Sequence, residues 1–197
     1  MKKVQSVAAA LMLGLSLFVP GVVAQQFVVK PVAEKKLAQL PAGQLVWRVE
    51  TMPTLEQARA AEGPTSLVAQ ADGKVWLFTL GAAGGATPGA LRKAEIGPVP
   101  ALSAPEYLLR VNLAGGPPGS KTPIHTHPGS ESFYVLTGRL GQRTLQGEAL
   151  VDAGQTMNGK GADVAMEVFS AGTTDLQTLV MFVVDATRPF SSHASIK

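Results

Sequence analysis

The chain has 197 residues, of which 46% are hydrophobic and 16% charged, which is enough for one domain with a full core and excludes a charge-rich disordered chain. The formal net charge is +3, but Lys2 and Lys3 lie in a segment that we expect to be removed, and without them 15 basic residues face 14 acidic ones, a net charge of +1. This balance gives no reason to expect a nucleic-acid partner. The absence of cysteine excludes disulfides, thiolate metal ligands and a cysteine nucleophile.

Residues 1–24 have the features of a secretory signal peptide. Two lysines begin the segment, a mostly apolar run follows, and Val22-Val23-Ala24 places small residues at the −3 and −1 positions. Cleavage after Ala24 predicts an exported mature chain, periplasmic or secreted. An uncleaved membrane anchor is the alternative, although the apolar run is short for roughly 30 Å of hydrocarbon. The later sequence predicts no further transmembrane span.

Residues 25–65 form a predicted N-terminal extension. Within it, residues 45–49 alternate in the manner of a strand, and residues 32–40 suggest a short helical turn. Residues 54–62 give the clearest helix, because Thr54 can cap it and Gln57 completes a capping box. We expect this helix to pack on the outside of a β core.

Residues 66–187 form the predicted β domain, which a tail at residues 188–197 follows. Glycine and proline together number 35, which favours many turns between short strands. Asp72-Gly73 predicts a hairpin turn, and residues 81–89 an exposed, mobile loop of glycine and alanine. The expected strands are residues 74–80, 106–113, 139–144, 164–169 and 176–185. Strands at this spacing, with no long helix, predict an all-β sandwich or barrel.

Arg110 and Asn112 lie on one face of the strand at residues 106–113, opposite an apolar face. If their face lines the interior of a barrel, they are candidate ligands for an acidic or hydroxylated substrate. If the face is an edge in solvent, they are ordinary surface residues.

His125 and His127 carry the strongest functional signal. On a strand, residues two apart point to the same side, so both imidazoles would face one point. A turn at residues 128–130 lets Glu131 return toward them. Two neutral imidazoles and one carboxylate suit one divalent transition metal such as iron, manganese, nickel, copper or zinc. The alternative is that these are polar residues of an exposed strand.

The segment resembles the first motif of the cupin superfamily, G-x5-H-x-H-x3-E-x6-G. Its fixed positions are occupied, without a gap, by Gly119, His125, His127, Glu131 and Gly138. The resemblance implies an all-β fold, a double-stranded β-helix or jelly-roll barrel with a short N-terminal helical extension. It covers about residues 66–185. If Glu131 points inward, Phe133 and Val135 point inward too, and Tyr134 faces the other way as packing.

The second cupin motif is incomplete, since residues 154–172 contain no histidine. Aligning the closing strand places Met166 where the fourth ligand would lie. Three interpretations of Met166 stay open: core packing, a weak thioether ligand that would indicate copper, and a residue lining a pocket beside an open metal position. Glu167 would face the opposite side of the strand. We expect His193 to be an exposed residue of a poorly ordered tail.

Two histidines and one carboxylate leave metal positions for water, dioxygen or a substrate. Non-heme iron(II) oxygenases use this ligand set, and the same opening suits Lewis-acid hydrolysis or isomerisation. The leading hypothesis is an exported, metal-dependent oxygenase similar to the quercetin-dioxygenase-like cupins and acting on an unknown small molecule. The alternative is a non-catalytic module of the cell envelope that binds a small ligand or metal. A homodimer is a candidate assembly.

Overall fold

The computed structural model describes residues 26–196, so the predicted signal peptide lies outside the described part of the chain. One helix and fourteen strands make up these residues. They are β1 (Val28–Leu37), β2 (Val46–Met52), α1 (Leu55–Ala60), β3 (Ser66–Ala71), β4 (Lys74–Gly81), β5 (Leu91–Ile96), β6 (Tyr107–Gly116), β7 (His125–Thr126), β8 (Gly129–Thr137), β9 (Arg139–Thr144), β10 (Gly147–Asp152), β11 (Thr156–Met157), β12 (Met166–Ser170), β13 (Leu176–Asp185) and β14 (Ser192–His193).

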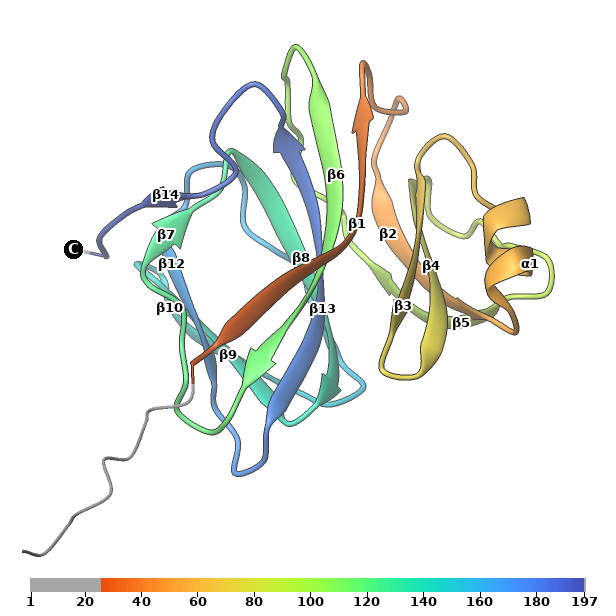
Figure 1. Ribbon diagram of the computed structural model, residues 1–197. Helices are drawn as coiled ribbons and strands as arrows, with labels where there is room; N and C mark the ends of the chain where they lie inside the picture. The colour runs from red at the N-terminus through yellow and green to blue at the C-terminus, as the bar shows by residue number, and fades with distance from the viewer. Residues whose placement is uncertain (1–25, 197) are drawn as a thin grey trace, which may run out of the picture.

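The strands form three antiparallel sheets. A central sheet of order β1-β6-β13-β8-β11 and a second sheet of order β10-β9-β12-β7-β14 enclose the barrel, and a four-stranded sheet of order β3-β4-β2-β5 lies on the other side of the central sheet (Figure 1). The helix α1 lies on the far side of that outer sheet (Figure 1). The predicted all-β jelly-roll barrel is therefore confirmed.

The central sheet is apolar on both faces because it separates two cores. Along β13, Leu179 and Met181 face the core under the outer sheet, whereas Val180 and Phe182 face the barrel interior. Strand β8 alternates in the same way, and its Tyr134 packs on Trp76 of β4, with ring centroids 5.8 Å apart. Burial on two sides accounts for the near-continuous hydrophobic run of β13.

The helix α1 has the predicted N-terminal cap. The Thr54 hydroxyl oxygen accepts a hydrogen bond from the backbone N–H of Gln57 at 3.1 Å. The helix buries Ala58 against Met52 and Leu77 of the outer sheet, which confirms the expected packing on a β core. It is six residues long, and no helix among residues 26–196 is long and apolar enough to cross a membrane.

The prediction of a helical turn at residues 32–40 is wrong, because β1 extends to Leu37 and pairs with β6. Strand β1 lies at the edge of the central sheet, where Pro31 is tolerated beside a shift in register between Pro31 and Ala33. Strands on both sides of residue 66, the predicted start of the β domain, belong to the same sheets. Strand β1 belongs to the barrel, and β3, β4 and β5 join β2 in the outer sheet.

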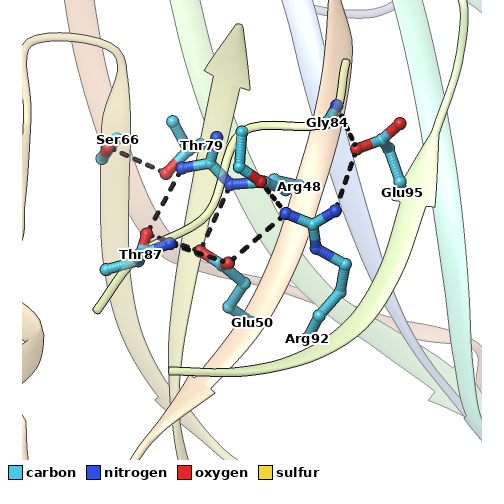
Figure 2. Close-up of polar contacts among 9 residues, drawn as sticks. Arg48, Glu50, Ser66, Thr79, Gly84, Thr87, Arg92 and Glu95 are labelled. Atoms are coloured by element: carbon cyan, nitrogen blue, oxygen red, sulfur yellow. Dashed lines mark hydrogen bonds and ion pairs between the residues drawn. The ribbon is translucent and has the colours of Figure 1, made fainter. Parts of the chain in front are cut away.

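The outer sheet buries one carboxylate, that of Glu50, which is 2% exposed. Figure 2 shows the guanidinium groups of Arg48 and Arg92 on either side of it, at 3.4 Å and 3.8 Å from its oxygens. The Thr87 hydroxyl donates a hydrogen bond to it at 2.7 Å. Since burial of an unpaired carboxylate is costly, these partners explain its burial. They also fasten the glycine-rich loop that contains Thr87 to the sheet.

Candidate metal centre

His125, His127 and Glu131 meet in the barrel interior. His125 lies in the two-residue strand β7, and Glu131 lies near the start of β8. One possible ligand atom from each residue can be chosen so that all three lie within 4.8 Å of one another. Three donors that share one ion at about 2.0–2.2 Å lie roughly 3–4 Å from one another. The arrangement therefore needs a closure of up to roughly 1–2 Å to hold an ion.

Both imidazoles are oriented by backbone carbonyls. The Nδ1 atom of His125 lies 2.8 Å from the carbonyl oxygen of Pro123, and the Nδ1 atom of His127 lies 2.6 Å from that of Phe190. A carbonyl can only accept, so Nδ1 carries the proton in both rings and donates it. Each Nε2 therefore keeps its lone pair for a metal, which is the usual outer-shell arrangement of histidine ligands.

The carboxyl group of Glu131 is enclosed and is 2% exposed. The side-chain amide of Gln142 donates to its Oε1 atom at 2.9 Å. A side chain at Gly159 would overlap the backbone of Glu131, so that glycine permits the close approach of the loop after β11. Burial raises the pKa of Glu131 to about 8, and the hydrogen bond from Gln142 lowers it in part.

His127 is neutral at physiological pH. The pKa of His127 is lowered to about 4, chiefly by burial and in part by its neighbours His125 and Arg110, although the hydrogen bond to the Phe190 carbonyl acts in the opposite direction. Its Nε2 atom lies 3.7 Å from Oε2 of Glu131. With a neutral imidazole and a protonated carboxyl the two do not form an ion pair. A divalent cation between them would replace the carboxyl proton, so the donor set fits such an ion.

Gln142 is the site residue that the sequence did not indicate, because it follows the last fixed glycine of the motif. Its Nε2 atom contacts both the Glu131 carboxyl and, at 3.5 Å, the sulfur of Met166. Met166 is buried beside this amide and is not among the described residues that line the cavity. Glu167 faces away, as expected, and pairs with Lys121 and Arg143 at 2.8 Å and 2.6 Å.

Changing Gln142 to leucine is expected to weaken metal binding by about tenfold, because outer-shell partners typically contribute 10–100-fold to metal affinity. The leucine would leave one Glu131 oxygen without its donor. The affinity can be measured by competition with a chelating dye. Gln146→Leu, on the exposed turn of the same hairpin, is the matched control. Equal affinity in the two variants would contradict a positioning role for Gln142.

The C-terminal segment differs from its prediction. Ser192 and His193 form β14, which pairs with β7 so that His193 lies opposite His125. His193 is exposed, as expected, but the expectation of a poorly ordered tail is wrong. A strand of two residues is too short to show an alternating pattern of hydrophobic and polar residues. The pairing of this segment with β7 therefore could not be predicted from the sequence.

A cavity of about 310 Å³ opens beside the three candidate ligands. Asn112 lines it and is 1% exposed. Arg110 lies one step along β6 on the same face, and its guanidinium covers the ring of Phe190 at 4.2 Å. Its Nε and Nη2 atoms also bind the Glu34 carboxylate of β1 at 2.9 Å and 2.6 Å. The structure thus places Asn112 in the cavity wall and Arg110 beside the C-terminal segment.

No family model matches the chain, and no curated protein sequence matches it significantly. Among solved structures, one of DMSP lyases is 20% identical, with 44% of this chain and 44% of that chain aligned and a TM-score of 0.38. A cupin superfamily protein from Desulfitobacterium hafniense DCB-2 is 13% identical over 39% of this chain and 68% of that one, with a TM-score of 0.35. An oxalate oxidase in complex with glycolate is 23% identical over 43% and 45%, with a TM-score of 0.37. The match spans less than half of the first of these structures.

Proposed function

We propose that this chain, a member of the cupin superfamily by its fold and its first motif, is an exported metal-binding protein that acts as a metal-dependent oxygenase on a small molecule. The observation that carries the proposal is the convergence of two imidazoles and one carboxylate at a cavity. The proposal of export stands on the signal-peptide features of residues 1–24.

The residues of the site fall into metal ligands and apolar residues that line the cavity. His125, His127 and Glu131 would hold one transition metal and leave it open toward the cavity. A redox-active ion bound by this ligand set supplies positions at which dioxygen and a substrate can meet. The apolar side chains around the site, Phe133, Val180 and Phe182 among them, would exclude water from it.

A non-catalytic binding module is the second candidate, and the position of Met166 is compatible with it as well as with the oxygenase. The residue at the expected place of the fourth ligand packs against Gln142, so three protein ligands remain. A module that binds a metal or a small molecule needs no exchangeable redox ion. It needs only the cavity and the three ligands.

Oxygen consumption separates the two candidates. The protein would be loaded without air with iron(II), manganese(II), nickel(II) or copper(I), its metal content measured, and oxygen uptake followed with phenols, keto acids and sugars. For an oxygenase we expect uptake that depends on one compound class and falls by at least about 100-fold in Glu131→Ala, which removes a metal ligand.

The matched control is Glu167→Gln, a change to a carboxylate that faces away from the cavity and binds Lys121 and Arg143. This variant should retain metal and activity. If no metal gives oxygen uptake and a small molecule binds saturably, the oxygenase would be rejected in favour of the module. A protein that retains no added metal would refute the oxygenase and the metal-binding module, and it would leave only a module that binds a small molecule.

A further inference from the structure

The third histidine of the chain lies at the same cavity as the other two. The sequence contains three histidines in total, and His125, His127 and His193 all line the cavity beside the candidate metal centre. His193 lies outside the motif that contains the other two, and it reaches the cavity because β14 pairs with β7. The fold therefore brings all three imidazoles of the chain to one place.

The pairing of β14 with β7 determines which way His193 faces. His193 lies directly opposite His125, and one step along the backbone N–H of Ala194 donates to the carbonyl of Ile124 at 3.1 Å. Because directly opposite pairs alternate between hydrogen-bonded and non-hydrogen-bonded, His193 and His125 form a non-hydrogen-bonded pair. The Cβ atoms of such a pair lie about 4.5–5.5 Å apart on the same face of the sheet. His193 thus shares the cavity side of β7 with His125.

His125 has a different neighbour on its other side. Strand β7 lies between β12 and β14, so Met166, His125 and His193 form one row across the second sheet. Met166 is 1% exposed, packs against the amide of Gln142 and does not line the cavity. His193 is exposed and lines the cavity. Of the two neighbours of His125 in this row, His193 is the one that can offer a nitrogen donor to an ion.

The ring of His193 can turn toward the other ligands. Backbone carbonyls orient the rings of His125 and His127, whereas no residue among 26–196 forms a hydrogen bond with the ring of His193. Its nitrogens are not among the three donor atoms that lie within 4.8 Å of one another. An exposed side chain changes rotamer within picoseconds to nanoseconds. Such a rotation brings the imidazole toward His125 without any movement of the backbone.

We propose that His193 is a fourth ligand of the metal held by His125, His127 and Glu131, and that the C-terminal segment delivers it. The inference deepens the proposed function and rests on it for the presence of the metal. Pairing of β14 with β7 holds the fourth imidazole beside the first, and the ring closes on the ion when the ion binds. Three imidazoles and one carboxylate form a nitrogen and oxygen donor set that suits a divalent transition metal.

Nitrogen-15 NMR of the histidine side chains tests the proposal on the wild-type chain without a histidine tag. Three histidines give three sets of imidazole signals, and the His193→Ala variant shows which set belongs to His193. With one equivalent of zinc, which is diamagnetic, we expect a ring nitrogen of all three imidazoles to shift to the position of a ligated nitrogen. If His125 and His127 shift while His193 does not, the proposal is overturned and the proposed function stands. A protein that takes up no zinc would refute both.

Zinc affinity, measured by competition with a chelating dye, separates a ligand from a residue that only braces β14. His193→Ala should lower the affinity by at least about tenfold, since even outer-shell partners contribute that much. The matched control is the double variant His193→Ala, Ala194→His, which keeps an imidazole in the segment but places it on the opposite face of the strand. It should bind zinc as weakly as the single variant. Wild-type affinity in either folded variant would contradict the assignment of His193 as a ligand.

Discussion

Metal affinity is expected to fall about 50-fold when the pH is lowered from 8 to 6. Burial raises the pKa of Glu131 to about 8, so at pH 6 only about 1% of the protein has this carboxyl ionised and ready to bind. His127 adds nothing to the change, because its pKa is lowered to about 4 and the imidazole stays neutral in this range. Competition of manganese(II) with a chelating dye at several pH values measures the effect.

Glu131→Gln is the matched control for this pH dependence. The amide has the same shape and no proton to lose, so this variant should bind metal weakly and without the Glu131 contribution. Any dependence on pH that persists in it arises from the other ligands. Equal dependence in wild type and variant would contradict the assignment of the proton to Glu131.

The same proton on Glu131 also makes the stability of the metal-free protein depend on pH. A carboxyl whose pKa is raised on folding, from 4.5 to about 8, stabilises the fold least at high pH, so stability should fall as the pH rises through this interval. His127, whose pKa is lowered from 6.5 to about 4, acts in the opposite sense and only below about pH 6.5. Between pH 6.5 and 8 we expect a loss of about 1 to 2 kcal/mol, absent in Glu131→Gln.

The sequence predicted the barrel because its strands are long enough to show alternation. Strand β13 begins and ends at the predicted residues 176 and 185, and the face of β8 that carries Glu131 also carries Phe133 into the cavity. The capped helix was predictable for a similar reason, since Thr54 and Gln57 act through local contacts. Local capping contacts and strict alternation along a strand can be recognised in a single sequence without any knowledge of the fold.

The unpredicted features depend on contacts between distant segments. Strands β7, β11 and β14 have two residues each, too few for a period, and β1 has lysines and a proline because it lies at an edge. Gln142 became recognisable only when pairing of β9 with β12 placed it between Glu131 and Met166. The acceptor for His127 is a backbone carbonyl 63 residues away. Every residue has such a carbonyl, so the residue types in the sequence do not indicate which one His127 contacts.

That carbonyl makes the C-terminal segment part of the candidate metal centre. Phe190 lies between the two sheets, with its ring centroid 4.8 Å from that of His127 and 4.9 Å from that of Phe182. Its own ring lies under the guanidinium of Arg110. Next to it, β14 pairs with β7, and the backbone N–H of Ala194 donates to the carbonyl of Ile124 at 3.1 Å. The segment therefore orients one ligand and braces the strand of the other.

Removal of residues 188–197 is expected to lower metal affinity by about 100-fold, the upper end of the effects of outer-shell partners. The Nδ1–H group of His127 would lose its acceptor at 2.6 Å, and the imidazole would be free to rotate or to change tautomer. A protein that ends at Ala194 retains Phe190 and β14 and should keep its affinity. Phe190→Ala retains the carbonyl without the ring, so it should bind metal nearly as well while exposing the cavity. Wild-type affinity in the protein that ends at Thr187, measured on folded material, would show that the tail does not position His127.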